Sequence, residues 1–546
     1  MGLRLIVGTE PALLFEPSRE TLRWSNANEA LGAFARAEDA LAHGYWIAGY
    51  LAYDGASAIG IFGSPSATGL PEPMQNVEQS PLLPLMSREA YGAGVRALQA
   101  AIREGDVYQV NYSVPFALNT AGNPSELYAR HARSSGARYQ AYVEDGDVAI
   151  LSWSPELFLS FEGERLTARP MKGTASLDRV DDLRNAKNRA EHVMIVDLLR
   201  NDLHRVCDDV EVEAFQTIER YPTYATMTST IAGKVRPHTP LGEIFGAMFP
   251  CGSVTGAPKR SAMRFIAQSE GRMRGVYCGS VGYLSPRRRG WWNVAIRTAQ
   301  LDRVSGLGRY DAGGAIVADS RADDEWDEIA IKSRFLQCAL EDNSSDSSFA
   351  LLETFADDAD DATLRAHLAR LERSARVFGI AVDRQEIEGF VRRRSNVRQL
   401  VRLRLGLGGA TMSRDAMEKL PELVCICISN ERVRRSDPFL RHKTSWRPTH
   451  NAAMREAEAR DCFDALLRNE RGELTEGSRT TLFFEADGAL WTPPAACGVL
   501  PGILRERIIT EGRAHERAVT PDELRRAEAI CVGSSARGLL RAELIS

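Results

Sequence analysis

A glycine-rich loop that runs into a predicted helix is the first group of residues that could do chemistry. Residues 252–259 read Gly-Ser-Val-Thr-Gly-Ala-Pro-Lys, and the helix is predicted from Pro258 onwards. Backbone amides at a helix N-terminus lack acceptors inside the helix and can bind an anion. The glycine spacing differs from that of a P-loop, and no Lys-Ser or Lys-Thr pair closes the segment. Taken alone, these glycines would indicate only an ordinary turn. Whether the loop binds an anion therefore depends on the residues around it.

A second group lies on one face of a predicted helix at 323–340. Glu325, Glu328 and Lys332 are spaced at i, i+3 and i+7, which places the three side chains on the same face. The simplest interpretation is a surface ion pair between Glu328 and Lys332. Carboxylate oxygens are also the ligands that Mg²⁺ prefers, so a metal site is the alternative.

A third group surrounds a lysine in the middle of the N-terminal half. Residues 169–175 read Arg-Pro-Met-Lys-Gly-Thr-Ala and are predicted to form a turn. They follow a predicted strand with the sequence Ser-Pro-Glu, and its Glu156 lies 16 residues before Lys172. A lysine in an isolated turn would point to solvent.

The elements that must position these residues are predicted from hydrophobic periodicity. In the N-terminal part we expect strands at 148–153 and 157–161 and helices at 187–203, 258–268 and 323–340. In the C-terminal part we expect a helix at 364–377, strands at 401–406, 423–429 and 481–484, and turns at 471–477. This order predicts an α+β fold with large sheets rather than regular βαβ units.

Length and composition set the remaining limits. The chain has 546 residues, and the serine-rich segment 341–348 predicts a linker between domains at 1–340 and 349–546. A net charge of −5 gives no basic field that would suggest nucleic acid as a partner. We expect a cytoplasmic protein without a membrane partner, because we find neither a signal peptide nor an apolar stretch of about 20 residues. The nine cysteines are scattered, which predicts neither disulfides nor a zinc site.

Four stretches of the N-terminal part together resemble the chorismate-utilising enzymes, the family of anthranilate synthase component I. They are residues 105–111, 154–175, 191–202 and a fourth stretch that runs from 250–259 to 313–320. The resemblance implies the fold of that family, a domain of β-sheets and helices. In the family, lysine at the position of Lys172 is typical of members that make 4-amino-4-deoxychorismate, whereas alanine is typical of anthranilate synthase.

The resemblance implies the chemistry of this site. Lys172 is the expected nucleophile, which attacks C2 of chorismate as the C4 hydroxyl leaves, before ammonia attacks C4 and expels the lysine. The amine must be neutral, so burial or a nearby cation should lower its pKa. Glu156 is the expected general acid and base for the departing hydroxyl, because hydroxide is a poor leaving group.

The resemblance also implies ligands for the two carboxylates of chorismate. Glu191 and Glu328, together with Glu325, are expected to hold a Mg²⁺ that binds the ring carboxylate. Arg297 matches the family's carboxylate-binding arginine. The expected substrate-binding residues are Arg297, Gly256, Ala257, Gly313, Gly314 and Lys332.

Two features of some relatives are not carried over. Some relatives have histidine at the position of Thr226, so the role of that histidine is not assigned here. A glutaminase would show a Gly-x-Cys-x-Gly turn followed by His-x-Glu, and we find neither in the sequence. Ammonia is therefore expected from solution or from a separate glutamine amidotransferase subunit.

The C-terminal part resembles the class IV pyridoxal-phosphate enzymes, a group that includes branched-chain transaminases and 4-amino-4-deoxychorismate lyase. Residues 441–444, 475–483, 498–505 and 532–535 carry this resemblance, which implies an α/β domain. Lys443 is expected to bind pyridoxal 5'-phosphate covalently and to shuttle the proton. Glu476 is expected to pair with the pyridine nitrogen, which makes the ring an electron sink. The expected phosphate ligands are Arg370, the amides of Ile503 and Leu504, and Ser534 or Ser535.

The resemblance has two further implications for the C-terminal part. The family's usual first hairpin is missing before residues 349–354, so the N-terminal part or a partner fills the gap, or the site is impaired. Relatives are commonly dimers with the cofactor near the interface, and a homodimer is therefore expected.

Together the two resemblances predict a synthase of 4-amino-4-deoxychorismate joined to a lyase that consumes it, giving p-aminobenzoate and pyruvate for folate synthesis. Three alternatives remain open. The C-terminal part could be a class IV amino-acid transaminase, one of the two parts could be non-catalytic, or the N-terminal part could form anthranilate, against which Lys172 argues.

Overall fold

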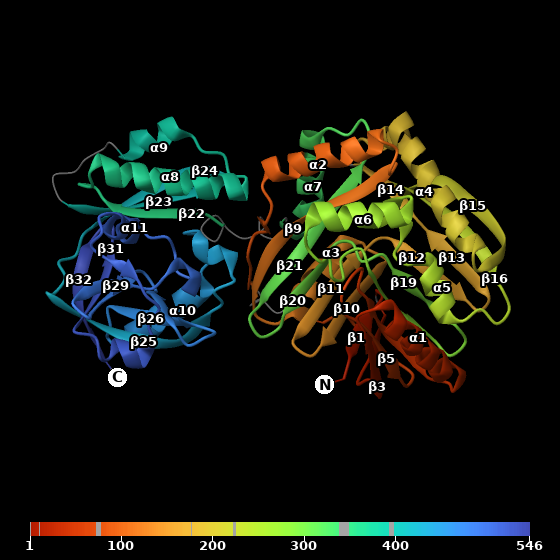
Figure 1. The fold of residues 1–546 in the computed structure, drawn as a ribbon, viewed down its shortest axis with the longest axis horizontal. Helices are drawn as coiled ribbons and strands as arrows, with labels where there is room; N and C mark the ends of the chain where they lie inside the picture. Colours follow the sequence, from red (N-terminus) through yellow and green to blue (C-terminus); the bar gives the residue numbers. More distant parts are fainter. Residues whose placement is uncertain are drawn as a thin grey trace. The chain divides into compact units, whose positions relative to one another are not determined.

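The structure is a computed structural model that describes residues 2–9, 11–71, 78–175, 177–221, 225–337, 349–391 and 398–545. The chain divides into two compact units, Met1–Ala339 and Leu340–Ser546, whose elements are labelled in Figure 1. The predicted linker at 341–348 lies outside the described residues. Within the described ranges, none of the helices has the length and apolar character needed to cross a membrane.

The first unit is built from two large antiparallel sheets. One sheet has 11 strands, ordered β17-β9-β21-β20-β11-β10-β1-β2-β6, with β7 and β8 also pairing with β9. Its strands are β17 (Gly256–Ala257), β9 (Gln109–Ala121), β21 (Leu307–Ile316), β20 (Thr298–Asp302), β11 (Val148–Ser154), β10 (Tyr139–Asp145), β1 (Arg4–Val7), β2 (Ala12–Phe15), β6 (Ser66–Thr68), β7 (Glu78–Gln79) and β8 (Leu83–Pro84).

The other sheet has 10 strands, ordered β14-β16-β13-β12-β19-β18-β4-β5-β3, with β15 also pairing with β16. Its strands are β14 (Met171–Ala175), β16 (Ala225–Val235), β13 (Arg165–Arg169), β12 (Leu157–Glu162), β19 (Arg289–Asn293), β18 (Ser280–Leu284), β4 (Trp46–Leu51), β5 (Ser57–Phe62), β3 (Glu20–Trp24) and β15 (Cys207–Arg220).

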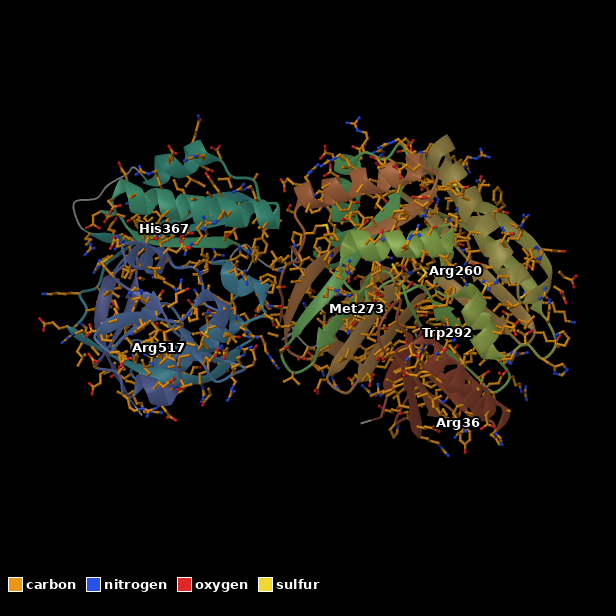
Figure 2. The ribbon with its side chains drawn as sticks, viewed as in Figure 1. Arg36, Arg260, Met273, Trp292, His367 and Arg517 are labelled. Atoms are coloured by element: carbon orange, nitrogen blue, oxygen red, sulfur yellow. The ribbon has the colours of Figure 1, made fainter. Side chains whose placement is uncertain are left out.

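Apolar side chains of the two sheets meet in a shared core. Leu5 and Val143 from the first sheet pack in one buried cluster with Ala48 and Val281 from the second. Successive side chains of a strand point to opposite faces, so the other face of each sheet needs its own cover. Helices provide it, and Trp292 of β19, labelled in Figure 2, packs at 5.4 Å between ring centroids against Phe245 of the helix α5.

The helices of the first unit cover the outer faces of the two sheets. Helix α6 packs on β9, α7 packs on β21 and α2 packs on α7, as Figure 1 shows along one side of the unit. Helix α4 packs on β15 and β16, and α1 packs on α5. The bounds are α1 (Ala27–Ala42), α2 (Arg88–Arg103), α3 (Pro124–Ser135), α4 (Ala186–His204), α5 (Leu241–Met248), α6 (Lys259–Glu270) and α7 (Ala322–Gln337).

The second unit contains a three-stranded antiparallel sheet, β22-β23-β24, and an eight-stranded mixed sheet, β27-β26-β25-β32-β31-β28-β29-β30. Helix α8, which carries His367 in Figure 2, packs on β22, while α10 packs on β25 and β26. The strands are β22 (Leu351–Ala356), β23 (Gln399–Gly406), β24 (Gly409–Ala416), β25 (Leu423–Val433), β26 (Asp464–Asn469), β27 (Leu474–Gly477), β28 (Thr481–Ala486), β29 (Ala489–Thr492), β30 (His515–Glu516), β31 (Ala529–Ser534) and β32 (Gly538–Leu544). The helices are α8 (Asp361–Phe378), α9 (Arg384–Val391), α10 (Pro448–Ala459), α11 (Ile503–Thr510) and α12 (Pro521–Leu524).

The predicted α+β class is confirmed, and the predicted strands and helices lie within about two to four residues of observed ones. Two predicted turns are wrong. Most of the segment 169–175 is strand β14, because it pairs with β16, and residues 474–477 are strand β27, because they pair with β26. All four residues of β27 are buried, so tertiary pairing prevails over the turn-like composition of this segment.

Candidate active sites

Glu156 lies in the short connection between β11 and β12, and its side chain is buried. Its Oε1 accepts a hydrogen bond of 2.7 Å from the Ser253 hydroxyl and a longer one of 3.4 Å from the backbone amide of Met171. Burial raises the pKa of Glu156 to about 7, and the Ser253 hydrogen bond and the charge of Lys172 oppose this rise. A carboxyl group of this kind can gain or lose a proton near neutral pH, as a general acid or base must.

Lys172 lies on β14, where burial lowers its pKa. Four other predicted site residues are close enough to act on this pKa through their charges. Glu191 raises it, Lys332 lowers it, and Glu156 and Glu328 raise it. The structure therefore brings these five residues together from β14, the loop after β11, α4 and α7.

The carboxylates of α7 have different environments. Glu328 forms an ion pair of 2.7 Å with Lys332, whose Nζ also donates to the carbonyl of Gly313 at 2.8 Å. Glu325 is buried and accepts a hydrogen bond of 2.7 Å from the Ser320 hydroxyl. Across the described residues, no three His, Cys, Asp or Glu side chains are grouped so that they could hold a metal ion. Glu191, Glu325 and Glu328 as ligands of a metal ion stay a prediction, and the charges of Glu191 and Glu328 act on Lys172.

The glycine pair of β21 lies against α7. A Cβ on Gly314 would lie 3.2 Å from a carboxylate oxygen of Glu325, and one on Gly313 would lie 2.5 Å from the Tyr112 carbonyl. Side chains at either position would thus disturb the packing of β21 beside the predicted site. Gly313 therefore requires glycine for close approach to backbone, whereas at Gly314 the Glu325 side chain would have to shift by a few tenths of an ångström.

The predicted anion loop precedes α6, which begins at Lys259 with Pro258 as its N-cap. Gly256 and Ala257 form β17, which pairs with Val110 and Gln109 of β9. Gly256 has φ +140°, and a Cβ there would lie 2.1 Å from the Gln109 carbonyl, so only glycine fits. The loop that carries Ser253 is thereby anchored to β9 directly before α6 begins.

Arg297 lies between β19 and β20 with φ +49°, and its carbonyl accepts a hydrogen bond of 3.0 Å from the Trp153 amide. Its charge also acts on Tyr310 of β21, which places the guanidinium beside that strand. Arg297 thus lies within electrostatic range of Tyr310, while its contact with substrate stays a prediction.

Sequence reasoning missed three residues that shape this site. Ser253 donates to Glu156, Thr226 donates to the carbonyl next to Lys172, and His192 lies 2.6 Å from the Ser229 hydroxyl through Nε2. Burial lowers the pKa of His192 to about 4. Ser253 belongs to the glycine loop, so its position could have been singled out, whereas the other two contacts depend on pairing across β16.

Lys443 of the second unit lies between β25 and α10, where its carbonyl accepts a hydrogen bond of 2.8 Å from the Leu352 amide of β22. Burial lowers the pKa of Lys443 to about 8. Arg370 and Arg447 lower it further, while Glu353 and Glu476 act in the opposite direction. Lys443 is thus close to two of the other residues predicted for the cofactor, Arg370 and Glu476.

Arg370 is buried on α8 and makes hydrogen bonds of 2.9 and 2.6 Å to the two carboxylate oxygens of Glu353. Its Nη1 donates to the Pro501 carbonyl at 3.2 Å, two residues before Ile503 begins α11. The guanidinium is therefore held at the N-terminus of α11, whose first amides include those of Ile503 and Leu504. An anion placed there would meet both a cation and helix amides.

The serines predicted for the phosphate differ in their contacts. Ser534 ends β31, and its carbonyl accepts a hydrogen bond from the Arg537 amide at 3.2 Å. The Ser535 hydroxyl lies 2.8 Å from Nε2 of His367 and donates to the Thr354 carbonyl at 3.4 Å. The Ser535 hydroxyl thus has two protein partners, and Ser534 or Ser535 as a phosphate ligand stays a prediction.

Glu476 of β27 is buried, and its Oε1 receives two contacts. Nε2 of His450 lies 3.3 Å from this oxygen, and the Leu500 amide donates to it at 3.2 Å. An amine on Lys443, a cation beside α11 and a fixed buried carboxylate are the groups that pyridoxal phosphate requires, so these residues fit the cofactor.

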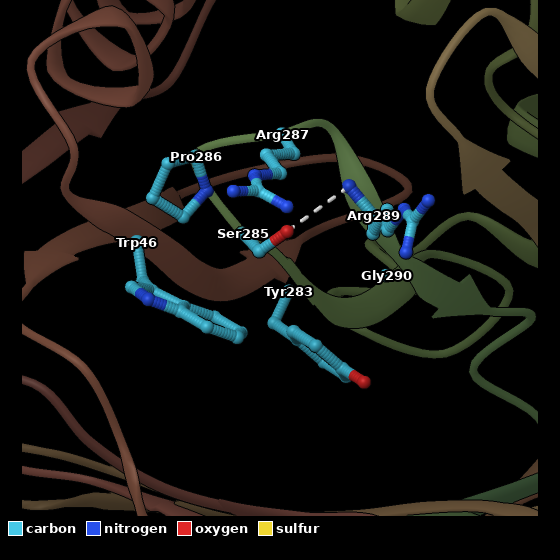
Figure 3. A pocket seen from close by; sticks show the side chains of 7 residues that line it. All are labelled: Trp46, Tyr283, Ser285, Pro286, Arg287, Arg289 and Gly290. Atoms are coloured by element: carbon cyan, nitrogen blue, oxygen red, sulfur yellow. Dashed lines mark hydrogen bonds between the residues drawn. The ribbon is translucent and has the colours of Figure 1, made fainter.

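A surface pocket of about 410 Å³ lies elsewhere in the first unit. Figure 3 shows it at the turn between β18 and β19, where the Arg289 amide donates to the Ser285 hydroxyl. None of the predicted site residues lines it. The lining residues are Trp46, Tyr283, Ser285, Pro286, Arg287, Arg289 and Gly290.

Comparison with known proteins matches both units. The family model described as chorismate binding enzyme matches residues 56–337, and the one described as amino-transferase class IV matches residues 362–545. Anthranilate synthase component I from Streptococcus pneumoniae has a solved structure that matches with a TM-score of 0.51 at 22% identity, covering 62% of this chain and 92% of that one. This likeness concerns the fold.

Two curated relatives match the first unit to nearly the same degree. Aminodeoxychorismate synthase component 1 of Salmonella typhimurium is 37% identical over 254 residues, which is 44% of this chain and 56% of that protein. Anthranilate synthase component 1 of Aquifex aeolicus is 36% identical over 267 residues, or 47% of this chain and 53% of that protein. The chain spans about half the length of these relatives. Because the first family model covers just over half of its residues, this chain belongs to the chorismate binding enzymes, and it carries an amino-transferase class IV domain in its C-terminal unit.

Proposed function

We propose that the first unit converts chorismate and ammonia to 4-amino-4-deoxychorismate, and that the second unit converts this product to p-aminobenzoate and pyruvate. The observation that carries the proposal is Lys172 beside Glu156. The pKa of the lysine is lowered by burial and that of the carboxyl is raised to about 7. A lysine with a lowered pKa more readily supplies a neutral amine, and a carboxyl with a pKa of about 7 can donate a proton near neutral pH.

In the first step the neutral amine of Lys172 attacks C2 of chorismate. The ring double bonds shift, the bond between C4 and its oxygen breaks, and Glu156 gives its proton to the departing oxygen, which leaves as water. The new ammonium on C2 loses a proton. Ammonia then attacks C4, the double bonds shift back, and Lys172 leaves C2 and recovers its proton.

The dicarboxylate substrate needs positive partners. Lys332, Arg297 and the N-terminus of α6 are the proposed carboxylate ligands. The charge of Lys332 acts on Lys172, and the loop before α6 carries Ser253, which donates to Glu156. Glu191 and Glu328 would hold a Mg²⁺ with substrate and water oxygens as further ligands. The bound ion would neutralise the ring carboxylate of chorismate and stabilise its position.

In the second unit the proposed roles follow from the contacts of the predicted residues. Arg370 and the amides that begin α11 would hold the phosphate of pyridoxal phosphate, and Glu476 would pair with its pyridine nitrogen. The cofactor, when bound, supplies an electron sink. Lys443, whose pKa is lowered to about 8, takes the proton from C4 of the amino substrate while the bond between C3 and the ether oxygen breaks and the ring becomes aromatic. The proton is returned to the departing enolpyruvate, which becomes pyruvate.

The source of ammonia and the assembly complete the proposal. We infer that a separate glutamine amidotransferase subunit supplies ammonia, with free ammonium as the substitute in vitro. A homodimer in the cytoplasm is the proposed state. Joining a synthase to the enzyme that consumes its product explains why both domains occur in one chain, and this favours a lyase over an amino-acid transaminase.

A product assay tests the proposal. The purified chain is incubated with chorismate, Mg²⁺, ammonium and pyridoxal phosphate, and products are separated by liquid chromatography with mass detection. We expect p-aminobenzoate and pyruvate in equal amounts. Anthranilate would refute the role of Lys172, and accumulation of 4-amino-4-deoxychorismate with the intact chain would refute the lyase. Amino transfer from an amino acid to a 2-oxo acid would identify a transaminase instead.

A further inference from the structure

The strand that carries Lys172 contains a β-bulge. Lys172 pairs with Met227 of β16, whereas Thr174 pairs with Thr226, so Gly173 is an extra residue on β14. Gly173 has φ +73°, a conformation that glycine adopts without strain. A bulge redirects the side chains beside it, and bulges are frequent next to active sites.

The place of the bulge decides which face of the sheet Lys172 occupies. A shift of one residue in strand register moves side chains to the opposite face. If the extra residue were at position 172 instead of 173, Lys172 would lose its present orientation toward Glu156, Glu191 and Glu328. The reactive amine thus depends on a bulge that stays at Gly173.

Thr226 holds the bulge from the neighbouring strand. Its side chain is fully buried, and its hydroxyl donates a hydrogen bond of 2.6 Å to the Gly173 carbonyl. A bulge interrupts the regular ladder, and a buried carbonyl without a partner is costly. The hydroxyl of Thr226 satisfies this carbonyl only while the extra residue is Gly173.

Two other hydroxyls on β16 have different partners. The Thr228 hydroxyl, which is also buried, donates to the Thr217 carbonyl of β15 at 3.4 Å. The Ser229 hydroxyl contacts His192 of α4 at 2.6 Å. Of these three, Thr226 is the one that reaches β14, so Thr228 offers a matched control on the same strand.

We propose that Thr226 is a positioning residue, whose hydroxyl fixes the bulge at Gly173 and thereby aims the Lys172 amine at the substrate. The proposal rests on the proposed function, because it assigns Thr226 a part in the first step. Thr226 does not touch the reacting atoms in this assignment. It acts through Gly173 on Lys172.

The experiment compares the full chain with Thr226→Val, Thr226→Ser and Thr228→Val. Valine keeps the branched shape that suits a strand and removes the hydroxyl. Each protein is mixed with chorismate and Mg²⁺ without ammonium, and the adduct on Lys172, chorismate minus water, is followed by intact mass. A second measurement labels lysines with trinitrobenzenesulfonate and compares Lys172 with Lys234, an exposed lysine on β16, by peptide mass spectrometry.

We expect Thr226→Val to form the adduct about 100-fold more slowly, as for a reacting group misplaced by about 1 Å. Its labelling ratio of Lys172 to Lys234 should rise, because the released amine reaches solvent. Thr226→Ser should recover both readouts toward wild type, and Thr228→Val should match wild type in both. Because unfolding would also stop adduct formation and expose Lys172, both readouts are compared only between proteins whose circular dichroism and urea unfolding midpoint match wild type.

Equal adduct rates and labelling ratios in Thr226→Val and Thr228→Val would overturn the proposal. If Thr226→Val is recovered unfolded, Thr226→Cys, which places a weaker donor there, is compared by the same readouts. If the wild-type chain forms no adduct, the proposed function fails. The labelling ratio then decides separately whether Thr226 holds Lys172 in place.

Discussion

The hydrogen bond from Ser253 to Glu156 should set the pH range of the first step. We predict that Ser253→Ala moves the alkaline limb of the pH profile for adduct formation on Lys172 to higher pH. The Ser253 hydroxyl donates to Oε1 of Glu156 at 2.7 Å, and both side chains are buried. This bond stabilises the charged form of the carboxyl and so holds its pKa down against burial.

The size of the shift follows from the energy of the bond. A hydrogen bond to a charged group contributes about 1.5–3 kcal/mol, and about 1.4 kcal/mol corresponds to one pH unit. Removing the bond should raise the pKa of Glu156 from its present value of about 7 and move the limb up by about 1 to 2 pH units. As a general acid Glu156 must be protonated, so activity falls where it ionises.

The assay is the rate of adduct formation on Lys172 with chorismate and Mg²⁺, measured without ammonium so that the titration of ammonia does not enter. Ser285→Ala is the matched control, because it also removes a buried serine hydroxyl, at the turn beside the pocket of Figure 3. An alkaline limb that stays in place or moves down in Ser253→Ala would refute the reasoning.

Three further outcomes are expected. The pKa of Glu156 lies above its ordinary value in the folded chain, so its stabilising effect is present at low pH and is lost as pH rises toward 7. Glu156→Gln should therefore abolish adduct formation. At pH 8 its free energy of unfolding, measured in urea, should exceed that of wild type by up to about 3 kcal/mol. A gain in this free energy that does not grow with pH would contradict the prediction. Lys443→Ala should accumulate 4-amino-4-deoxychorismate from chorismate and lose the visible absorbance of bound pyridoxal phosphate. The control Lys419→Ala should still form p-aminobenzoate and keep this absorbance. Removing Mg²⁺ with EDTA should stop the first step and leave conversion of supplied 4-amino-4-deoxychorismate intact, and equal inhibition of both steps would argue against a metal site confined to the first unit.

Much of the fold could be predicted from local sequence, because several elements have strong periodicity or caps. Helix α8 extends from Asp361 to Phe378, with Asp360 as N-cap and Gly379 as C-cap, and its apolar spacing predicts most of this length. Strand β11 follows equally from its apolar run. These features depend on residues near one another in the chain.

Features that depend on distant residues could not be predicted in this way. The bulge at Gly173 exists because β14 pairs with β16, more than 50 residues later, and composition alone indicated a turn. Helical spacing places Glu325 on one face with Glu328, but spacing does not show that the Glu325 carboxylate also accepts a hydrogen bond from Ser320. The lowered pKa of Lys172 likewise depends on burial and on charges from residues distant in the chain, which no local pattern contains.

Strand β32 lies inside the eight-stranded sheet of the second unit, between β25 and β31. It pairs in parallel with β25, which begins more than 100 residues earlier, and in antiparallel with β31. During synthesis β25 and β31 would therefore keep unpaired edges until residues 538–544 leave the ribosome. Open edges of this kind promote association between chains. A chain ended before Gly538 should aggregate rather than fold, so fusions and truncations for study of the second unit need to preserve these residues.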